Sequence, residues 1–195
     1  MPAMGADELT DHVVAAAREG DQAACARIWH ALAPRVAGYL RSRGAQDAED
    51  LTSEVFLAVF RAMPDFDGGA GPLTAYTFTV AQRRLVDQWR RDGRRPDAVP
   101  WSEERDHRTS DSAEDLALAR AEPARVEALL ADLTEEQREV LALRILGDLT
   151  VEQVARVVGR RPGAVKALQR RGLAVLRKKF HGTRTPVRVP GDDRE

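Results

Sequence analysis

The side chains with the clearest chemical potential are the cations near the C-terminal end of the chain. Residues 156–180 contain nine lysines and arginines and no aspartate or glutamate. Phosphates attract such cations and the major groove of duplex DNA admits one helix, so a basic helix here favours contact with DNA. The alternative is a solvated basic face on an ordinary helical hairpin. The nine cations are Arg156, Arg160, Arg161, Lys166, Arg170, Arg171, Arg177, Lys178 and Lys179.

The residues around these cations predict a helix-turn-helix over residues 148–179 that would position them. Thr150 is a suitable N-cap, Gly159 can end the first helix in a left-handed conformation, and Pro162 suits the first turn of the second helix. The short glycine-containing turn favours DNA binding over the solvated hairpin. Apolar residues recur at helical spacing and are expected to be buried: Val151, Val154, Ala155 and Val158, then Val165, Leu168, Leu173 and Leu176.

A second basic block lies in the first half of the chain. Residues 82–95 hold six arginines against two aspartates, and they follow a glycine-rich loop at 64–72. Tyr76, Phe78 and Trp89 interleave with the polar residues of this segment. Aromatic rings beside arginines are typical of proteins that stack single-stranded bases, whereas the alternative places these rings in the core. Leu73, Tyr76, Val80 and Leu85 are expected to be buried.

The segment before that loop predicts an amphipathic helix with an acidic outer face. Its inward residues are Leu51, Val55, Ala58, Val59 and Met63, and its outer face carries Asp47, Glu49, Asp50 and Glu54. Acidic residues near a helix start interact favourably with the helix dipole. Four carboxylates exceed what capping requires, so a basic protein partner is a second interpretation.

Helical periodicity continues through most of the 195 residues, whose formal charge of −1 conceals strong local segregation. We expect an all-α fold of two small helical domains, residues 1–95 and 113–180, joined by a flexible acidic linker at 96–112 and followed by a disordered tail at 181–195. The predicted helices are 7–19, 22–43, 46–63, 73–94, 113–131, 134–146, 150–158 and 162–179. Trp101 in the linker either packs on a neighbouring helix or docks on a partner.

Other features limit the possible functions. Cys25 is the single cysteine, which excludes an intramolecular disulfide, and its apolar neighbours predict a small buried side chain. The four histidines are dispersed, and no nucleophile or phosphate-loop motif is present, so we expect no enzyme activity, metal or cofactor. The absence of a signal pattern or a membrane-length apolar stretch predicts a cytoplasmic protein without membrane contact.

In order, spacing and length, residues 47–91 and 133–177 together resemble the two domains of bacterial extracytoplasmic-function (ECF) sigma factors. The resemblance implies a subunit that gives RNA polymerase its promoter specificity. Its partners would be promoter DNA, the coiled coil of the largest polymerase subunit, the polymerase flap and an anti-sigma factor. A stand-alone helix-turn-helix regulator is the alternative, although it leaves the acidic helix and the first basic block unexplained.

The resemblance also implies roles for individual residues. The polymerase-core contacts would be Asp47, Asp50, Glu54 and Phe56. The residues that recognise and melt the −10 element would be Asp67, Gly68, Tyr76, Arg83, Arg84, Gln88 and Arg91. The −35 element would be read by Arg160, Arg161, Lys166, Ala167, Arg170 and Arg171. Among these, Arg161, Lys166 and Arg170 are our candidates for base contacts and Arg171 for a phosphate contact.

The sequence also departs from the family pattern. Tyr76 stands where such proteins often have tryptophan, and Arg83 where they often have asparagine. Ala167 and Leu168 replace a frequent Ser-Arg pair, so the promoter sequence cannot be inferred by analogy.

Overall fold

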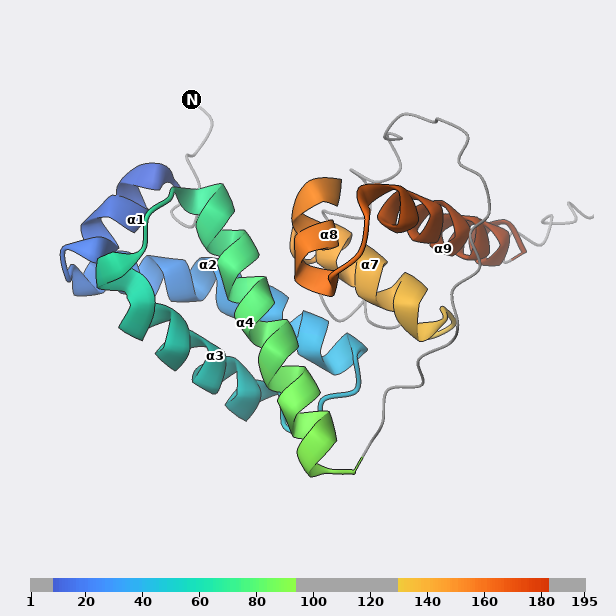
Figure 1. The fold of residues 1–195 in the computed structure, drawn as a ribbon, viewed down its shortest axis with the longest axis horizontal. Coiled ribbons are helices and arrows are strands. Elements are labelled where there is room, and N and C mark those ends of the chain that lie inside the picture. Colours follow the sequence, from blue (N-terminus) through green and yellow to red (C-terminus); the bar gives the residue numbers. More distant parts are fainter. Residues whose placement is uncertain (1–8, 94–129, 183–195) are drawn as a thin grey trace, which may run out of the picture.

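The computed structural model describes residues 9–93 and 130–182, and every regular element in these two ranges is helical. We call the first range the N-terminal bundle and the second the C-terminal bundle. The N-terminal bundle contains α1 (Asp11–Arg18), α2 (Gln22–Ser42), α3 (Ala48–Ala62), the 3-10 helix η1 (Met63–Asp65) and α4 (Ala70–Arg91). The C-terminal bundle contains α7 (Glu135–Ile145), α8 (Val151–Val158) and α9 (Pro162–Gly182) (Figure 1). The all-α prediction is confirmed.

Most predicted helices match these bounds within a few residues; α1 begins at Asp11, four residues later than predicted, and the start of α4 also differs. This helix begins at Ala70 rather than at residue 73, so only residues 66–69 separate η1 from α4. Pro72 therefore lies in the first helical turn, where its missing N–H would have no intrahelical partner in any case. α9 continues to Gly182, beyond the predicted end. The predicted linker, Trp101 and nearly all of the predicted 113–131 helix lie outside the described residues.

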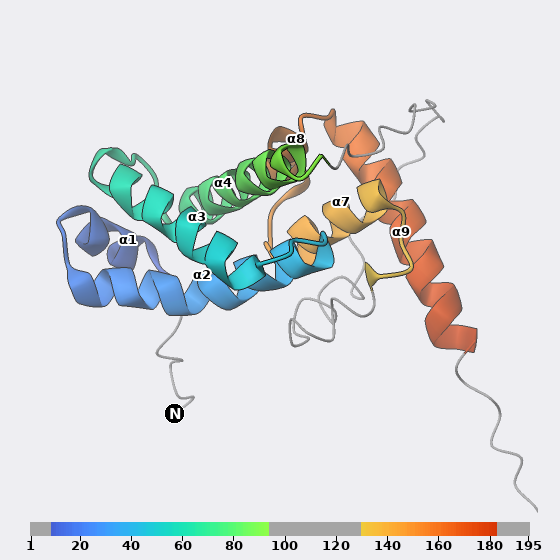
Figure 2. The same ribbon diagram turned by 90° about the horizontal axis from the view of Figure 1, so that it is seen from below.

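Three long helices enclose the core of the N-terminal bundle. α2 packs against both α3 and α4, and α1 covers one end of this arrangement (Figure 2). Ile28, Leu32, Val55 and Leu73 are almost completely buried between these helices. Each side chain of this size stabilises the fold by about 1.5–3 kcal/mol when it is removed from water. These side chains are part of an apolar cluster that continues into the C-terminal bundle.

The C-terminal bundle forms around a close approach of two helices. A Cβ atom added to Gly172 of α9 would lie 2.7 Å from Cδ1 of Leu141 in α7. Glycine at position 172 therefore lets these helices come together, and Val165, Leu168 and Leu176 of α9 are buried alongside. These three residues belong to the predicted stripe of α9, which is confirmed.

The two bundles contact one another through α2 and α7 and through α4 and α8. Nε of Arg35 in α2 donates a hydrogen bond of 2.6 Å to the carbonyl of Leu146, just after α7. Nε2 of Gln153 in α8 lies 3.5 Å from the carbonyl oxygen of Gly71 in α4. Figure 1 accordingly shows α4 with α3 on one side and α8 on the other. We call these contacts, together with the ion pairs described next, the bundle interface.

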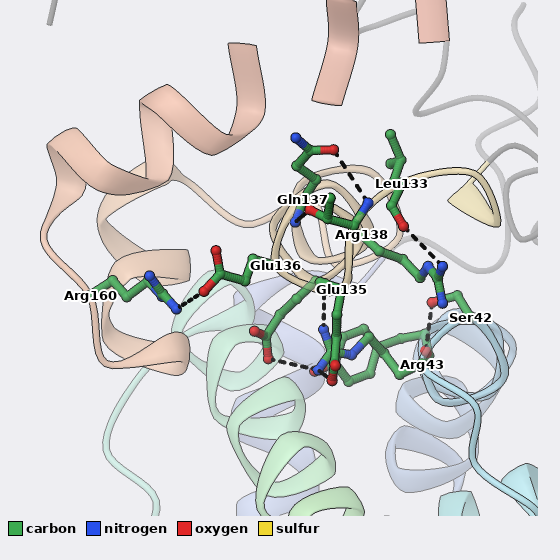
Figure 3. A network of polar contacts seen from close by, with 11 residues as sticks. Ser42, Arg43, Leu133, Glu135, Glu136, Gln137, Arg138 and Arg160 are labelled. Carbon is green, nitrogen blue, oxygen red and sulfur yellow. Dashed lines mark hydrogen bonds and ion pairs between the residues drawn. The ribbon is translucent and has the colours of Figure 1, made fainter. Parts of the chain in front are cut away.

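At the centre of the bundle interface is the guanidinium of Arg43, which follows α2 (Figure 3). Its side chain is 4% exposed and lies 3.3 Å from a carboxylate oxygen of Glu135 and 3.5 Å from one of Glu139. It also donates a hydrogen bond of 3.1 Å to the carbonyl of Glu135 and lies 5.3 Å from the centre of the Trp89 ring. Burial raises the pKa of Glu139, while Arg43 and a hydrogen bond from Gln82 oppose that rise. Charged groups from both bundles are thus buried together.

Candidate nucleic-acid and polymerase surfaces

The helix-turn-helix has the local geometry that its sequence predicts. Thr150 caps α8 in a capping box with Gln153, and Gly159 ends the helix with a φ of 68°. This left-handed conformation costs glycine little because it has no Cβ atom. Pro162 begins α9, as predicted. One detail differs: Val157 is buried within α8, whereas Val158 is only partly buried.

The first half of α9 presents the cations that were predicted to read DNA. Lys166 and Arg170 are exposed one helical turn apart, and Arg161 is exposed just before the helix. Ala167 and Arg171 are partly exposed on the same side, and Nε of Arg171 donates a hydrogen bond of 3.4 Å to the carbonyl of Ala167. The result is a convex basic surface that a major groove can accommodate.

Two residues of the C-terminal bundle are positioned for structural roles. Arg160 donates a hydrogen bond of 2.5 Å to Glu136 of α7, and both side chains are about three-quarters buried (Figure 3). Arg160 therefore fastens the turn to α7, which differs from the free DNA contact that we expected. Leu168, at 3% exposure, belongs to the core, so it cannot replace the arginine that the family often has there.

The loop before α4 is short and packed. The rings of Phe66 and Tyr76 pack with their centroids 5.8 Å apart. Tyr76 is partly exposed, whereas the sequence predicted that it would be buried. A Cβ atom at Gly68 would lie 2.9 Å from Cβ of Pro72, so the loop folds closely against the first turn of α4. Asp67 is exposed at the tip of this loop. The predicted loop residues Asp67 and Gly68 thus lie beside Tyr76.

The outer face of α4 carries the other residues predicted to contact the −10 element. Arg83, Arg84 and Arg91 are exposed, whereas Gln88 is partly buried, and its Oε1 has no hydrogen-bond partner among the described residues. Phe78 and Trp89 are not available for base stacking, because they are 0% and 7% exposed. For these two rings the core interpretation is correct.

The acidic surface of α3 is confirmed in part. Asp47, Asp50 and Glu54 are exposed, and Glu54 lies 3.7 Å from NH1 of Arg84 in an exposed ion pair. Phe56 is 1% exposed, and its ring lies 4.7 Å from that of Trp29. The prediction that Phe56 contacts the polymerase is therefore wrong, because its ring fills the core.

The sequence analysis missed the apolar residue of this surface. Leu57 is 57% exposed, and it lies seven residues after Asp50 and three after Glu54, on the same helical face. Extending the acidic face by helical spacing would have found it. The α3 surface, defined as Asp50, Glu54 and Leu57, therefore combines negative charge with one exposed apolar side chain.

Several other expectations concern chemistry rather than recognition. Cys25 is partly buried against the core, and burial followed by Asp21 raises the pKa of its thiol. In residues 9–93 and 130–182, no three histidine, cysteine, aspartate or glutamate side chains gather as a metal site would require. Across the same part of the chain, no helix is both long and apolar enough to span a membrane.

Both bundles match regions of one class of protein. Residues 28–95 match the family described as Sigma-70 region 2, and residues 129–178 match the family described as Sigma-70 region 4. The first match includes α2 from residue 28 onward, α3 and α4, and the second includes the helix-turn-helix. The two bundles therefore define a sigma factor, and α1 lies before the first matched region.

Comparison with relatives identifies the family within this class. The chain is 36% identical over 170 residues to the ECF RNA polymerase sigma factor ShbA of Streptomyces griseus subsp. griseus, a match that covers 82% of this chain and 88% of the relative. It is 33% identical over 178 residues to the ECF RNA polymerase sigma factor SigD of Mycobacterium tuberculosis, covering 87% of this chain and 83% of SigD. The chain belongs to the ECF RNA polymerase sigma factors. This favours the sigma-factor interpretation over a stand-alone regulator.

A solved structure has a similar fold. CnrH, determined in complex with the cytosolic domain of CnrY, aligns with a TM-score of 0.58 and 24% sequence identity. The alignment covers 89% of this chain and 97% of CnrH.

Proposed function

We propose that this sigma factor binds core RNA polymerase and contacts promoter DNA through two separate basic surfaces. The observation that carries the proposal is that the exposed cations lie on two bundles, on α4 in one and on α9 in the other. The chain itself would supply no catalysis, because it would direct the polymerase to its start sites. Polymerase and promoter DNA as partners imply a cytoplasmic location.

In this proposal α9 enters the major groove at the −35 element. Lys166, Arg170 and Arg161 are exposed where the N-terminal half of a recognition helix meets base edges. Arg171, held against the carbonyl of Ala167, contributes to binding through a phosphate. Arg160 supports this surface through Glu136 instead of contacting bases.

The loop at 66–69 and the outer face of α4 would capture the melted −10 element. Extruding a base costs a few kcal/mol, which stacking and hydrogen bonds to the base must offset. Tyr76 and Phe66 provide aromatic surface beside Asp67 and Gly68, and Arg83 and Arg84 provide cations for the strand backbone. Gln88 lies on the same helix, and its buried Oε1 has no hydrogen-bond partner among the described residues. Arg91 extends the basic face.

The α3 surface is the proposed docking site for the coiled coil of the largest polymerase subunit. Asp50 and Glu54 offer charge to a basic partner, and Leu57 offers an exposed apolar contact beside them. Asp47, at the start of the helix, would extend the acidic area. The flap of the polymerase would bind the C-terminal bundle.

We also propose control by an anti-sigma protein that covers these surfaces. The similar fold of CnrH was determined with the cytosolic domain of another protein, CnrY. The two bundles contact one another through the bundle interface, so such a partner would cover outer surfaces or separate the bundles. A candidate from the native cell should be displaced from the purified sigma factor by core polymerase; a candidate that binds together with core would not be an anti-sigma protein.

Reconstitution with core polymerase tests the proposed function. Transcription starts should be mapped on genomic DNA with the wild-type chain and with a double variant, K166A and R170A. The wild type should create a distinct set of starts, and the double variant should bind core normally but lose those starts. Specific duplex binding without polymerase, together with no redirected starts, would support the stand-alone regulator instead.

A further inference from the structure

The start of α4 is capped by a residue from a different helix. The N-cap residue of α4 is Gly69, which has no side chain to accept a hydrogen bond from the first turn. The amide of Ala70 instead donates a hydrogen bond of 2.7 Å to Oδ1 of Asp11, in the first turn of α1. A carboxylate at this place also interacts favourably with the positive end of the helix dipole. The cap thus connects segments 59 residues apart in sequence.

The geometry around Gly69 is built for this contact. A Cβ atom at Gly69 would lie 2.2 Å from Oδ1 of Asp11, so the carboxylate occupies the space that any other side chain would need. The φ of Gly69 is −95°, which most residues adopt, so a larger side chain here would act by displacing the Asp11 carboxylate and not by straining the backbone. α1 also contacts η1 and α4, the two elements on either side of the loop.

The loop transmits the position of this cap to the residues that we propose capture the −10 element. Only residues 66–69 connect η1 with α4, so a shift of the first turn of α4 must move the loop. Phe66 packs on Tyr76, and Gly68 packs on Phe66 and Pro72. Displacement of Asp11 would therefore alter the aromatic pair and the exposed Asp67 together.

We propose that Asp11 is a positioning residue for promoter melting, which holds the loop at 66–69 in the conformation that accepts the extruded base. This inference rests on the proposed function of the loop. Asp11 lies outside the matched Sigma-70 region 2, which begins at residue 28. It acts through the Ala70 amide and contacts no DNA itself.

The test compares two capping carboxylates. Asp21 caps α2 with hydrogen bonds of 2.8 and 3.3 Å to the amides of Ala23 and Ala24, and it is exposed like Asp11. D21A therefore removes an equivalent cap in the same bundle away from the loop. D11N keeps an oxygen that can accept the hydrogen bond of Ala70. The three variants D11A, D11N and D21A are assembled into holoenzyme with core polymerase.

The measured quantity is the affinity of each holoenzyme for a fluorescent non-template-strand oligonucleotide that spans the −10 element of a promoter mapped with the wild type. D11A should weaken this affinity about fivefold, the size of a lost helix cap, with core affinity unchanged. D11N should stay within about twofold of the wild type, because it retains the capping acceptor. D21A should lower the unfolding midpoint about as much as D11A does, without weakening oligonucleotide binding.

The outcomes separate this inference from the function on which it rests. Wild-type holoenzyme that does not bind the oligonucleotide would overturn both. Normal binding by the wild type and equally good binding by D11A would overturn the positioning role alone. Equal loss of binding in D11A and D21A would also overturn it, since general destabilisation would then explain the effect. Permanganate reactivity of the promoter should follow the same ranking as oligonucleotide binding.

Discussion

Replacing Arg43 with alanine should loosen the bundle interface. The substitution leaves the Glu139 side chain, which is 15% exposed, without its partner in a largely buried site. Breaking a buried ion pair by removing one partner costs about 3–5 kcal/mol. The pair with Glu135 adds little because the Glu135 side chain is 43% exposed. Glu139 can also take up a proton, since burial already raises its pKa.

These opposing effects lead us to expect a loss of about 2–4 kcal/mol in the free energy that holds the bundles together. That loss shifts the ratio of closed to separated molecules by about 30-fold to 1,000-fold. The helices within each bundle also pack on one another, so we expect each bundle to remain folded. Small-angle X-ray scattering of the full chain should show a larger radius of gyration for R43A than for the wild type. Amide exchange should increase where α2 faces α7 and where α4 faces α8.

R90A is the matched control, because it removes the same positive charge from an exposed site. Arg90 pairs with Asp87 within α4 at 3.4 Å, and the two side chains are 74% and 59% exposed. Such a pair contributes at most about 1 kcal/mol, so R90A should scatter like the wild type. An R43A chain with the wild-type radius of gyration and wild-type exchange would refute the reasoning, since the buried pair would then not hold the bundles together.

Three further predictions concern the interface, α3 and α9. Burial raises the pKa of Glu139, so Glu139 favours the closed form at low pH, and this contribution is lost as the pH rises through the raised pKa. E139Q should therefore flatten this part of the pH dependence of the radius of gyration. An E139Q profile identical to that of the wild type would contradict the prediction. F56A should lower the free energy of unfolding by about 3–5 kcal/mol in urea titrations, whereas L57A should leave it within about 0.5 kcal/mol and weaken binding to core polymerase. R171A should reduce the slope of log affinity against log salt concentration by about one unit at every promoter. K166A should instead change the relative affinities of different promoters. Both effects are measured by fluorescence anisotropy with holoenzyme.

The local structure of the C-terminal bundle could be predicted from the sequence because its signals are short-range. Thr150 and Gln153 are three residues apart and cap each other, and Gly159 adopts a positive φ by itself. The start of α4 was placed too late for a related reason. Pro72 and the three glycines of residues 64–72 were interpreted as loop residues, although proline is compatible with a first turn and Asp11 supplies the missing cap.

The contacts that join distant segments could not be predicted from one sequence. Arg43 is one of many arginines, and its burial depends on Glu135 and Glu139, more than ninety residues later in the chain. The ion pair of Arg160 could not be predicted for the same reason, because its partner Glu136 lies on a different helix, α7. A helical spacing pattern identifies the charged face of a helix, but it does not tell which charges a second bundle will cover.

The composition of the bundle interface suits a contact that must open. The −35 and −10 elements are named by their positions, which are about 25 base pairs apart, or about 85 Å at 3.4 Å per base pair. In this structure, by contrast, α4 and α8 are in contact. Under the proposed function, binding both elements at once would therefore require the bundles to separate. The interface is held by ion pairs and by the bond from Arg35 to Leu146, and it buries a Tyr39 hydroxyl that has no partner among the described residues. Water can solvate all of these polar groups after separation, although the apolar cluster that runs through both bundles would also be parted, so we expect polymerase or DNA binding energy to drive the opening.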